Sequence, residues 1–560
     1  MSELSKPLSI ISESENSTVV TEYIPTEQDR SKYESEADLE KGFIKLLEQQ
    51  GYEYLRINNE QDLLNNLRNR IEKLNKYQFS ENDWQRFLKD VICNPNKGIL
   101  EKTRMIQRET VQEFLDEFDR LHNIKLIDKE DIHNNYLQVI NQYTQETNTR
   151  ENRYDVTILV NGLPMVHIEL KRRGVGIREA FVQIDRYQRD SFWSNCGLYE
   201  YIQLFVISNG TNTKYYSNTT REGLLKEKER GSKFKTSNSF EFTSYWADSK
   251  NNNIYDLIDF TRTFFSKNTI LNILTKYCVF TREELLLVMR PYQIVATEKI
   301  INKINIATTY KKYGTVEGGG FIWHTTGSGK TLTSFKTAQL ASRIEGVDKV
   351  LFVVDRRDLD YQTKKEYDRF EEGSADSSTS SRVLERQLSN KDKNGGYHEY
   401  KVIITTIQKL NQFLKKHLTH PVYDKHMVFI IDECHRSQFG DKLHTYTIVN
   451  AISDNNVLPF RIDYVNTIKE NPNAKNAKVV SVDKESAKLD TKRIENNVKY
   501  LFDNYSIKTK GSNPYTLNGK QVYGFSSIFA TESKKMAMYY YDAIKKKNQE
   551  HIPPDHDKKR

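Results

Sequence analysis

The sequence contains little cysteine and no long apolar run. Its 560 residues include four cysteines, at positions 93, 196, 278 and 434, which form neither a Cys-x-x-Cys pair nor a cluster with histidine. That spacing excludes a recognisable zinc site and predicts reduced thiols rather than disulfides. No run of about 18 apolar residues is available to span a bilayer, and the N-terminus lacks the basic-then-apolar pattern of a signal peptide. We therefore expect a cytoplasmic protein without a membrane partner.

An excess of charge of one sign is also missing. The 84 basic and 76 acidic residues leave a formal net charge of +8, which permits a polyanionic partner but does not by itself indicate DNA. The chain is too long for a single hydrophobic core and predicts several domains. Its first thirty residues, rich in Ser, Glu and Thr, are typical of a disordered, solvated tail.

The most informative stretch is an apolar run, Phe321–His324, that leads into a turn of small residues. A strand, a Gly-rich turn and a helix together point backbone N–H groups and the helix dipole at phosphates, so this stretch predicts an ATP site. Lys330 would reach the terminal phosphates, and the Thr331 hydroxyl would ligate Mg²⁺. The residues assigned to the nucleotide are Thr326, Gly327, Ser328, Gly329, Lys330 and Thr331.

One position departs from the usual pattern of this loop. His324 stands where the first Gly is expected, so the turn depends on Gly327 and Gly329 for its unusual backbone angles. The helix that follows the turn is expected over residues 332–343.

Further along, apolar strands are expected at 349–354, 402–404 and 427–431, in the continuous pattern of a parallel sheet covered on both faces. The last of these strands ends in Asp432 and Glu433. Ligands bind beyond the carboxyl ends of such strands, so Asp432 is expected to reach Mg²⁺ and Glu433 to orient the hydrolytic water.

A hairpin is predicted earlier in the chain, where two alternating runs flank the pair Asn161-Gly162. A three-residue loop, 161–163, would place Val156 opposite Ile168, Ile158 opposite Val166, and Val160 opposite Pro164. One face is then apolar. Helical patterns are also expected at 37–47, closed by Gly51, and at 57–74 and 111–118, with a strand at 201–208.

The same register places Asp155 opposite Glu169 on the other face, with Lys171 two residues further along. Two carboxylates and a lysine suit metal-assisted cleavage of phosphodiesters: Asp155 and Glu169 would hold Mg²⁺, and Lys171 would orient or activate the attacking water. An ordinary solvated hairpin face is the alternative reading of these residues. Gln183 and Tyr187 follow on one face of a predicted helix.

Together with the ATP-binding pattern, these residues resemble the restriction (R) subunit of type I restriction-modification enzymes. The resemblance implies an α/β multidomain chain: a PD-(D/E)xK nuclease domain, a RecA-like superfamily 2 motor domain and a partial second RecA-like domain. It implies that Asp155, Glu169 and Lys171 form the cleavage triad, that Gln183 and Tyr187 position DNA or couple cleavage to the motor, and that Gln293, in Arg-x-Tyr-Gln, reads the adenine.

The resemblance also implies ATP and Mg²⁺ as cofactors, double-stranded DNA as substrate, and methyltransferase (M) and specificity (S) subunits as partners. An acidic residue on the first helix often completes such nuclease sites, and Glu36 and Glu40 both remain candidates. Segments 355–359 and 405–408 resemble DNA-contacting motifs, and His435 resembles a coupling residue of the family.

Two departures from the family follow His435. No Ser/Thr-rich coupling motif is present, and residues 444–449 and 456–461 already resemble the entry to the second motor domain. The expected organisation is a tail over 1–30, a nuclease domain over 31–265, a shortened first motor domain over 266–440 and a partial second one over 441–560. An internally shortened, truncated R subunit is therefore expected. A catalytically inactive DNA- or ATP-binding remnant and a helicase without nuclease activity are the alternatives.

Overall fold

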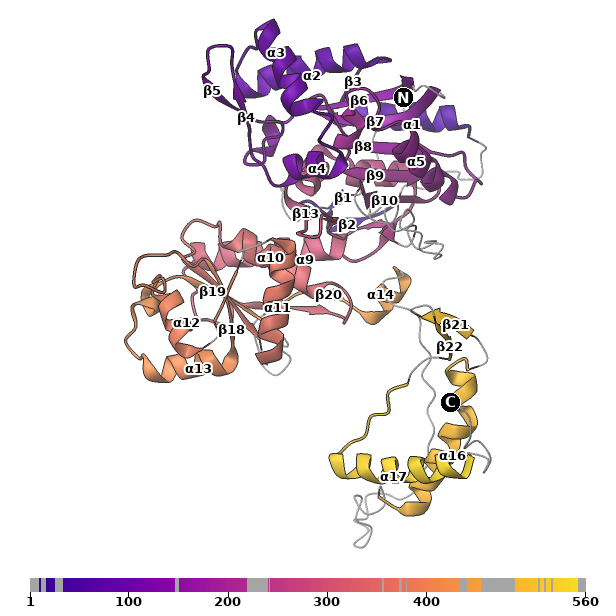
Figure 1. Ribbon diagram of the computed structural model, residues 1–560, viewed down its shortest axis with the longest axis vertical. Coiled ribbons are helices and arrows are strands. Elements are labelled where there is room, and N and C mark those ends of the chain that lie inside the picture. Colours follow the sequence, from indigo (N-terminus) through magenta and orange to yellow (C-terminus); the bar gives the residue numbers. More distant parts are fainter. Residues whose placement is uncertain are drawn as a thin grey trace. The chain divides into compact units, whose positions relative to one another are not determined.

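The computed structural model describes residues 10–11, 17–25, 34–146, 151–218, 240, 242–354, 357–371, 375–378, 380–432, 441–454, 489–511, 514–517, 520–524 and 527–551. The chain divides into two compact units, residues 1–458 and 459–560, which are described separately (Figure 1).

A six-stranded mixed sheet organises the N-terminal part of the first unit, in the order β10-β9-β8-β7-β6-β3 (Figure 1). Its strands are β3 (Glu53–Tyr54), β6 (Leu137–Glu146), β7 (Glu151–Val160), β8 (Leu163–Leu170), β9 (Leu204–Ser208) and β10 (Thr213–Ser217). The β8–β9 and β3–β6 pairs are parallel and the others antiparallel. Every residue of β8 is buried, because the strand is paired on both edges and helices α1 (Glu36–Gln49) and α5 (Arg178–Asp190) contact it.

The predicted hairpin forms, with a shorter turn than expected. Only Asn161 and Gly162 lie between β7 and β8, and both have positive φ, 52° and 85°. An irregularity between Ile158 and Leu159 then shifts the register, so Val156 pairs with Ile168 and Ile158 with Val166, as predicted. The prediction is wrong beside the turn, where Pro164 faces Leu159 instead of Val160. The bulge restores the register that a two-residue turn alone would have lost.

The surrounding elements test the other helical predictions. Helix α1 and helix α2 (Glu60–Asn75) are confirmed, and Gly51 ends α1 with a φ of 82°. The helix predicted over 111–118 is wrong: β4 (Gln112–Leu115) pairs with β5 (Leu121–Ile124) there. Burial alternates residue by residue along β4, which is a strand period rather than a helical one. Short helices complete this part: α3 (Glu81–Phe87), η1 (Leu88–Ile92), α4 (Ile99–Gln107), η2 (Ile132–Asn134) and η3 (Leu198–Tyr201).

Residues 17–25 do not behave as a solvated tail. Val19 and Tyr23 are buried in the N-terminal core, and the Tyr23 hydroxyl donates to Asp259 Oδ1 at 2.5 Å. The Thr18 N–H lies 3.2 Å from both carboxylate oxygens of Glu298. The tail predicted over the first thirty residues is therefore wrong for this stretch, because polar composition does not reveal two well-placed apolar anchors.

The cysteine prediction is wrong for Cys93 and Cys196, which form a disulfide across a sequence separation of 103 residues. Cys93 follows η1 and Cys196 precedes η3, so the fold brings together two positions that sequence spacing treats as unrelated. Cys278 is a free, buried thiol, and Cys434 lies outside the described residues. None of the described helices combines the length and the apolar character needed to cross a membrane.

The segment after the first sheet contains paired strands and short helices. They are β11 (Trp246–Ala247), β12 (Asn253–Ile254), α7 (Leu257–Phe264), α8 (Lys267–Asn272), η5 (Ile273–Tyr277), β13 (Cys278–Phe280) and β14 (Leu286–Val288). The N-terminal hydrophobic core continues through this segment to Ile294 and Val295, so the boundary predicted at residue 265 falls inside that core.

A second, parallel sheet follows in the order β17-β18-β16-β19. Its strands are β16 (Lys349–Val354), β17 (Asp376–Ser377), β18 (Val402–Thr406) and β19 (Met427–Ile431). The helices of this region are α9 (Pro291–Thr309), α10 (Lys330–Ala341), α11 (Arg357–Phe370), α12 (Ser381–Leu388), α13 (Ile407–Lys416) and the turn η6 (Pro421–Asp424) (Figure 1). The strands and the helix predicted after the Gly-rich turn are confirmed.

Strand β15 (Gly320–His324), which enters the Gly-rich loop, pairs in parallel with β20 (Asp441–Tyr446). Residues 441–446, expected at the start of a partial second domain, therefore pair with the strand that leads into the Gly-rich loop, and α14 (Ile448–Ser453) follows in the same unit. Trp323 and Phe429 remain about half exposed or more, at 60% and 48%.

The second unit, as far as it is described, contains α16 (Thr491–Lys508), α17 (Lys534–His551) and the hairpin β21 (Pro514–Leu517)–β22 (Lys520–Tyr523). Ile494, Val498 and Tyr540 form its small core. Residues 527–530, which precede α17, have no regular structure.

Candidate functional site

The structure brings together the three residues predicted on the hairpin. Asp155 extends from β7, and its Oδ2 accepts a hydrogen bond of 2.9 Å from the Leu170 N–H on β8. Lys171 Nζ donates to Glu169 Oε1 at 3.0 Å and to Leu170 O at 2.9 Å. The β-bulge described above is what allows Asp155 and Glu169 to share one face despite the two-residue turn.

The two carboxyl groups are held where ionisation is unfavourable. Glu169 is fully buried, and burial raises its pKa to about 7, although the Lys171 charge opposes the shift. Burial also raises the pKa of Asp155 to about 7, and repulsion from Glu169 adds to the effect. Two neighbouring carboxylates in such a site cannot easily both be charged unless a cation joins them.

The donor set fits a hard divalent cation. Glu169 Oε2 is buried and accepts no hydrogen bond among the described residues; it lies 3.4 Å from Nε2 of the buried His167. Burial lowers the pKa of His167 to about 4, so this imidazole is neutral near pH 7. No described group of three or more His, Cys, Asp or Glu side chains is arranged to hold a metal, but Mg²⁺ prefers carboxylate oxygens and keeps several waters, so a pair suffices.

The structure distinguishes the two acidic candidates on α1. Glu40 is buried; its pKa is raised by burial and also by the charge of Asp155. Its Oε1 accepts from Asn141 Nδ2 at 2.5 Å, and its Oε2 accepts from Gln142. Glu36 instead accepts from the exposed Arg172 N–H at 3.3 Å. Glu40 is therefore the acidic residue on the carboxylate side of the site, whereas Glu36 lies nearer Lys171 and Arg172.

Gln183 and Tyr187 meet on α5, one helical turn apart. Gln183 Nε2 donates to the Tyr187 hydroxyl at 2.6 Å, and this hydroxyl donates to Arg153 O at 2.8 Å, on β7. Burial, followed by the charge of Glu169, raises the pKa of Tyr187 to about 12. The pair therefore fixes α5 to the strand that carries Asp155 and acts as structural support, while only Gln183 is partly exposed.

The Gly-rich loop has the predicted geometry. Gly327 and Gly329 have φ values of 80° and 75°, and α10 begins at Lys330, so its first N–H groups face the loop. The Tyr292 hydroxyl and Gln293 Nε2 both donate to Ser328 O, at 2.8 and 3.0 Å. The first turn of α9 therefore holds the Gly-rich loop through two hydrogen bonds to Ser328 O.

Gln293 is fully engaged in this structure. Its Oε1 accepts from the Arg290 N–H at 3.0 Å, while its Nε2 contacts the loop carbonyls. A Cβ on Gly329 would lie only 2.5 Å from Gln293 Nε2, so the end of this flexible side chain would have to move, and the positive φ of 75° favours glycine there. Reading of an adenine by Gln293 would require this amide to leave the loop.

Other predicted positions are placed only in part. Asp432 directly follows β19, is half-buried, and donates its N–H to Val353 O at 3.0 Å; α10, which carries Thr331, contacts β19. Glu433, Cys434 and His435 lie outside the described residues, as do residues 355 and 356. Thr405 and Thr406, expected to touch DNA, are fully buried, which makes that prediction wrong for their side chains.

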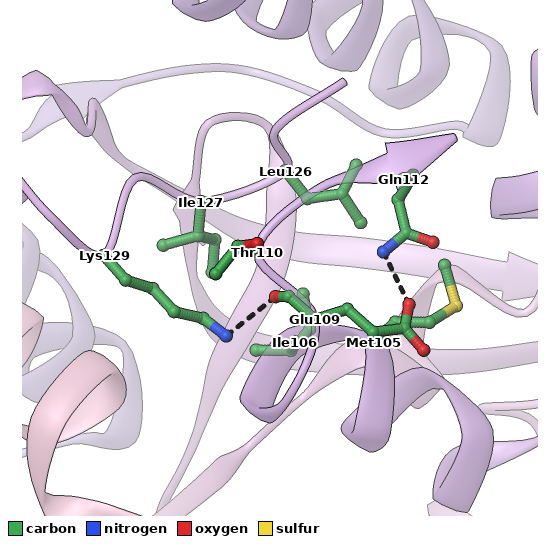
Figure 2. A pocket seen from close by; sticks show the side chains of 8 residues that line it. All are labelled: Met105, Ile106, Glu109, Thr110, Gln112, Leu126, Ile127 and Lys129. Carbon is green, nitrogen blue, oxygen red and sulfur yellow. Dashed lines mark hydrogen bonds between the residues drawn. The ribbon is translucent and has the colours of Figure 1, made fainter. Parts of the chain in front are cut away.

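A small pocket lies away from both sites, around the end of α4 (Figure 2). Lys129 Nζ donates to Glu109 O at 2.8 Å, and Gln112 Nε2 donates to Glu109 Oε2 at 2.7 Å. Its lining contains none of the residues predicted to bind nucleotide or metal.

Two protein families match successive parts of the chain. Residues 33–224 match the family described as type I restriction enzyme R protein N terminus, and residues 286–462 match type III restriction enzyme, res subunit. The type I restriction enzyme EcoprrI endonuclease subunit of Escherichia coli is 48% identical over 300 residues, which cover 53% of this chain and 91% of that protein.

The chain belongs to the family of type I restriction enzyme endonuclease (R) subunits. The type I restriction enzyme SsaAORF53P endonuclease subunit of Staphylococcus saprophyticus is 36% identical over 573 residues, covering 93% of this chain and 56% of that protein. The chain thus spans little more than half the length of this R-subunit relative. The match of 573 positions exceeds the 560 residues of the chain, so the relative has residues within the matched span that this chain lacks.

A solved structure, a nuclease-deletion mutant of the Type ISP restriction-modification enzyme LlaGI with a DNA substrate mimic, is 14% identical. The match covers 48% of this chain and 30% of the LlaGI chain. Its TM-score is 0.23, which supports no further argument about this R-subunit fold.

Sequence reasoning missed His167 and could not choose Glu40. His167 lies on β8 within the face that carries Glu169, so the alternation of the strand pointed to it, but histidine in a strand has no distinctive signal. Glu40 is separated from Asp155 by 115 residues, and only the fold shows which face of α1 turns toward the sheet.

Proposed function

We propose that this chain is an ATP- and Mg²⁺-dependent DNA endonuclease component of a type I restriction system, working in the cytoplasm on double-stranded DNA with M and S subunits. The observation that carries the proposal is the convergence of Asp155, Glu169 and Lys171 on one hairpin, upstream of a formed Gly-rich loop. In this proposal the first sheet is a PD-(D/E)xK nuclease fold and the second a RecA-like motor fold.

In the nuclease site, Asp155 and Glu169 would hold Mg²⁺, which when bound supplies Lewis acidity toward a phosphoryl oxygen. Lys171 is bonded to Glu169 and would orient the attacking water and offset the charge that develops on the phosphate. Glu40 would support the site from α1. Gln183 and Tyr187 would position α5 beside the scissile strand.

The rim of this site can attract a polyanion. Arg153, Arg172 and Arg186 are exposed, and the charges of Arg153 and Arg186 act on Glu40 and Glu169 respectively. Phosphate contacts of this kind position DNA without reading its sequence, which fits a subunit whose partner supplies specificity.

In the nucleotide site, the N–H groups of the loop from Thr326 to Thr331 would cradle the phosphates, and Lys330 would contact the terminal ones. Thr331 and Asp432 would hold the second Mg²⁺, with Glu433 orienting water and Gln293 contacting the base. Lys330→Ala should reduce ATP affinity below detection by calorimetry, because it removes the side-chain cation of the cradle. Unchanged affinity would count decisively against this site.

Plasmid cleavage tests the nuclease assignment. Glu169→Gln should lower the cleavage rate at least about hundredfold, since a direct metal ligand matters at least as much as its supporting residues. Glu179→Gln, an exposed substitution of the same kind on α5, is the matched control and should cleave at the parent rate. Equal cleavage by both variants would favour a helicase whose hairpin is structural.

Translocation is a separate activity and needs two motor lobes that move relative to each other. Displacement of a triplex strand at an ATP-dependent rate, by this chain with M and S subunits, is the direct test of translocation.

A further inference from the structure

Strand β20 joins the Gly-rich loop to residues 249–253 of the N-terminal part of the chain. His324, the last residue of β15, and His444, on β20, are buried at 8% and 5% exposure. His324 Nε2 lies 2.9 Å from His444 Nδ1, and His444 Nε2 lies 3.1 Å from Ser249 O. The histidine that replaces the first Gly of the loop pattern is therefore the first member of a hydrogen-bonded chain.

The acceptor at the far end fixes the direction of this chain. A carbonyl can only accept, so His444 Nε2 carries the hydrogen that bonds Ser249 O. In a neutral His444 ring Nδ1 then accepts, and His324 Nε2 donates to it. Burial lowers the pKa of His324 to about 3, which keeps this ring neutral near pH 7. Both hydrogen bonds then run from β15 toward residue 249.

Tyr446 provides a second, independent connection to the loop. Its ring stacks on Tyr292 with centroids 3.7 Å apart and an angle of 14° between the planes. Tyr292 in turn donates to Ser328 O, and the Thr325 N–H donates to Tyr446 O at 2.9 Å. The backbone of Thr325 is thus bonded directly to Tyr446, and the backbone of Ser328 is connected to Tyr446 through the ring of Tyr292.

The same strand is fastened on its other side to the segment that follows the first sheet. Asn251 Nδ2 donates to Thr445 O at 3.0 Å. The Tyr446 hydroxyl and Asn253 Nδ2 donate to the two carboxylate oxygens of Asp454, at 2.7 and 3.1 Å. Three hydrogen-bonded contacts therefore connect β20 to residues 249–253: His444 to Ser249, Thr445 to Asn251, and Tyr446 through Asp454 to Asn253.

We propose that His444 and Tyr446 are positioning residues through which occupancy of the Gly-rich loop is transmitted to residues 249–253 and so to the nuclease fold. The inference rests on the proposed binding of ATP at that loop. Ser249 is itself fixed to the N-terminal segment, since its N–H donates to Val20 O and its hydroxyl donates to Thr21 O at 2.9 Å. Phosphates that take the loop N–H groups constrain the backbone to which Tyr446 and Tyr292 are attached.

Amide hydrogen exchange measures this connection in the whole chain. Mg²⁺ with a non-hydrolysable ATP analogue should slow exchange at residues 249–253 at least about fivefold in the parent, the lower end of usual coupling between sites. His444→Leu should still bind the analogue but lose the slowing. Lys442→Ala, an exposed substitution on the same strand, is the matched control and should keep it.

Calorimetry of the parent separates the two claims. If the parent binds no analogue, the proposed function fails, and this inference fails with it. If the parent binds and residues 249–253 exchange at an unchanged rate, or if His444→Leu keeps the slowing, only this inference is overturned. Should His444→Leu not fold, Asn253→Ala, which removes one part-buried hydrogen bond to Asp454, is expected to reduce the slowing, and full retention would contradict the proposal.

Discussion

Glu169 belongs both to the buried core of the first sheet and to the proposed metal site. It lies on a strand buried at every position, yet it ends in a carboxyl whose Oε2 accepts no hydrogen bond among the described residues. A protein keeps such a group only at a cost in stability, because burial favours its neutral form. In the proposed site a cation would bind as the proton leaves, so metal binding would be coupled to proton release.

We predict that Glu169→Gln stabilises the metal-free chain at high pH. Below about pH 4.5 the carboxyl is protonated in both the folded and unfolded states, so the substitution should change little. Between there and the raised folded-state pKa of about 7, only the unfolded state ionises, so the parent loses stability as pH rises. At pH 8 in chelator the variant should be more stable by about 3 kcal/mol in denaturant unfolding. A difference that does not vary with pH would contradict this account, and Glu179→Gln is again the control.

The sequence was sufficient to predict this pair of carboxylates because alternation along a strand fixes which residues share a face. It was insufficient for the residues around them. Glu40 and His167 are brought in by helix and sheet packing, and the sequence does not show that Tyr187 is buried against β7. Local patterns show which residues share a strand face, but they do not show which helices pack against that face.

At the scale of elements, the β7–β8 turn and the bulge beside it together set the register of the hairpin. The turn is packed directly against helix α2: a Cβ on Gly162 would lie 2.6 Å from the Leu67 Cα. Because the obstacle is backbone, it cannot rotate away. Two features therefore require glycine at position 162: the positive φ and the close approach of the Leu67 backbone.

We predict that Gly162→Ala destabilises the chain much more than Gly174→Ala. Both glycines have φ near +85°, so both substitutions incur the same backbone strain of about 1 kcal/mol, but nothing lies within 4 Å of a Cβ on Gly174. Thermal melting should show a loss for Gly162→Ala that exceeds the loss for Gly174→Ala by about 1–3 kcal/mol. Equal losses of stability would mean that α2 moves away from the turn and accommodates the added Cβ.

Strand β20 shows why some elements resist prediction. Its residues read as the start of another lobe, yet the unpaired edge of β15 accepts them in parallel register. An exposed strand edge pairs with whatever compatible segment is within reach, so pairing depends on three-dimensional proximity that a linear pattern does not encode.

At the scale of the whole molecule, the boundary between the two sheets is a shared core rather than a linker. Ile270, Ile273, Tyr277 and Phe280 belong to the same buried cluster as the first sheet. The predicted division after residue 265 would remove these side chains from their partners and expose apolar surface.

We therefore predict that a fragment of residues 1–265 is insoluble or melts without cooperativity, whereas residues 1–458 give a cooperative transition. Differential scanning calorimetry of both fragments provides the comparison. A sharp, reversible transition from the shorter fragment would show that the cluster beyond residue 265 is dispensable.

The packing of Val19 and Tyr23 has a consequence for the order of events during synthesis. Their segment is translated first, but its partners Asp248, Asp259 and Glu298 follow 225 to 280 residues later. At roughly 5–20 residues per second, the segment must wait on the order of 10–60 s before its binding surface exists. The segment that contains Val19 and Tyr23 can therefore dock only after Glu298, on the helix that precedes the Gly-rich loop, has been synthesised.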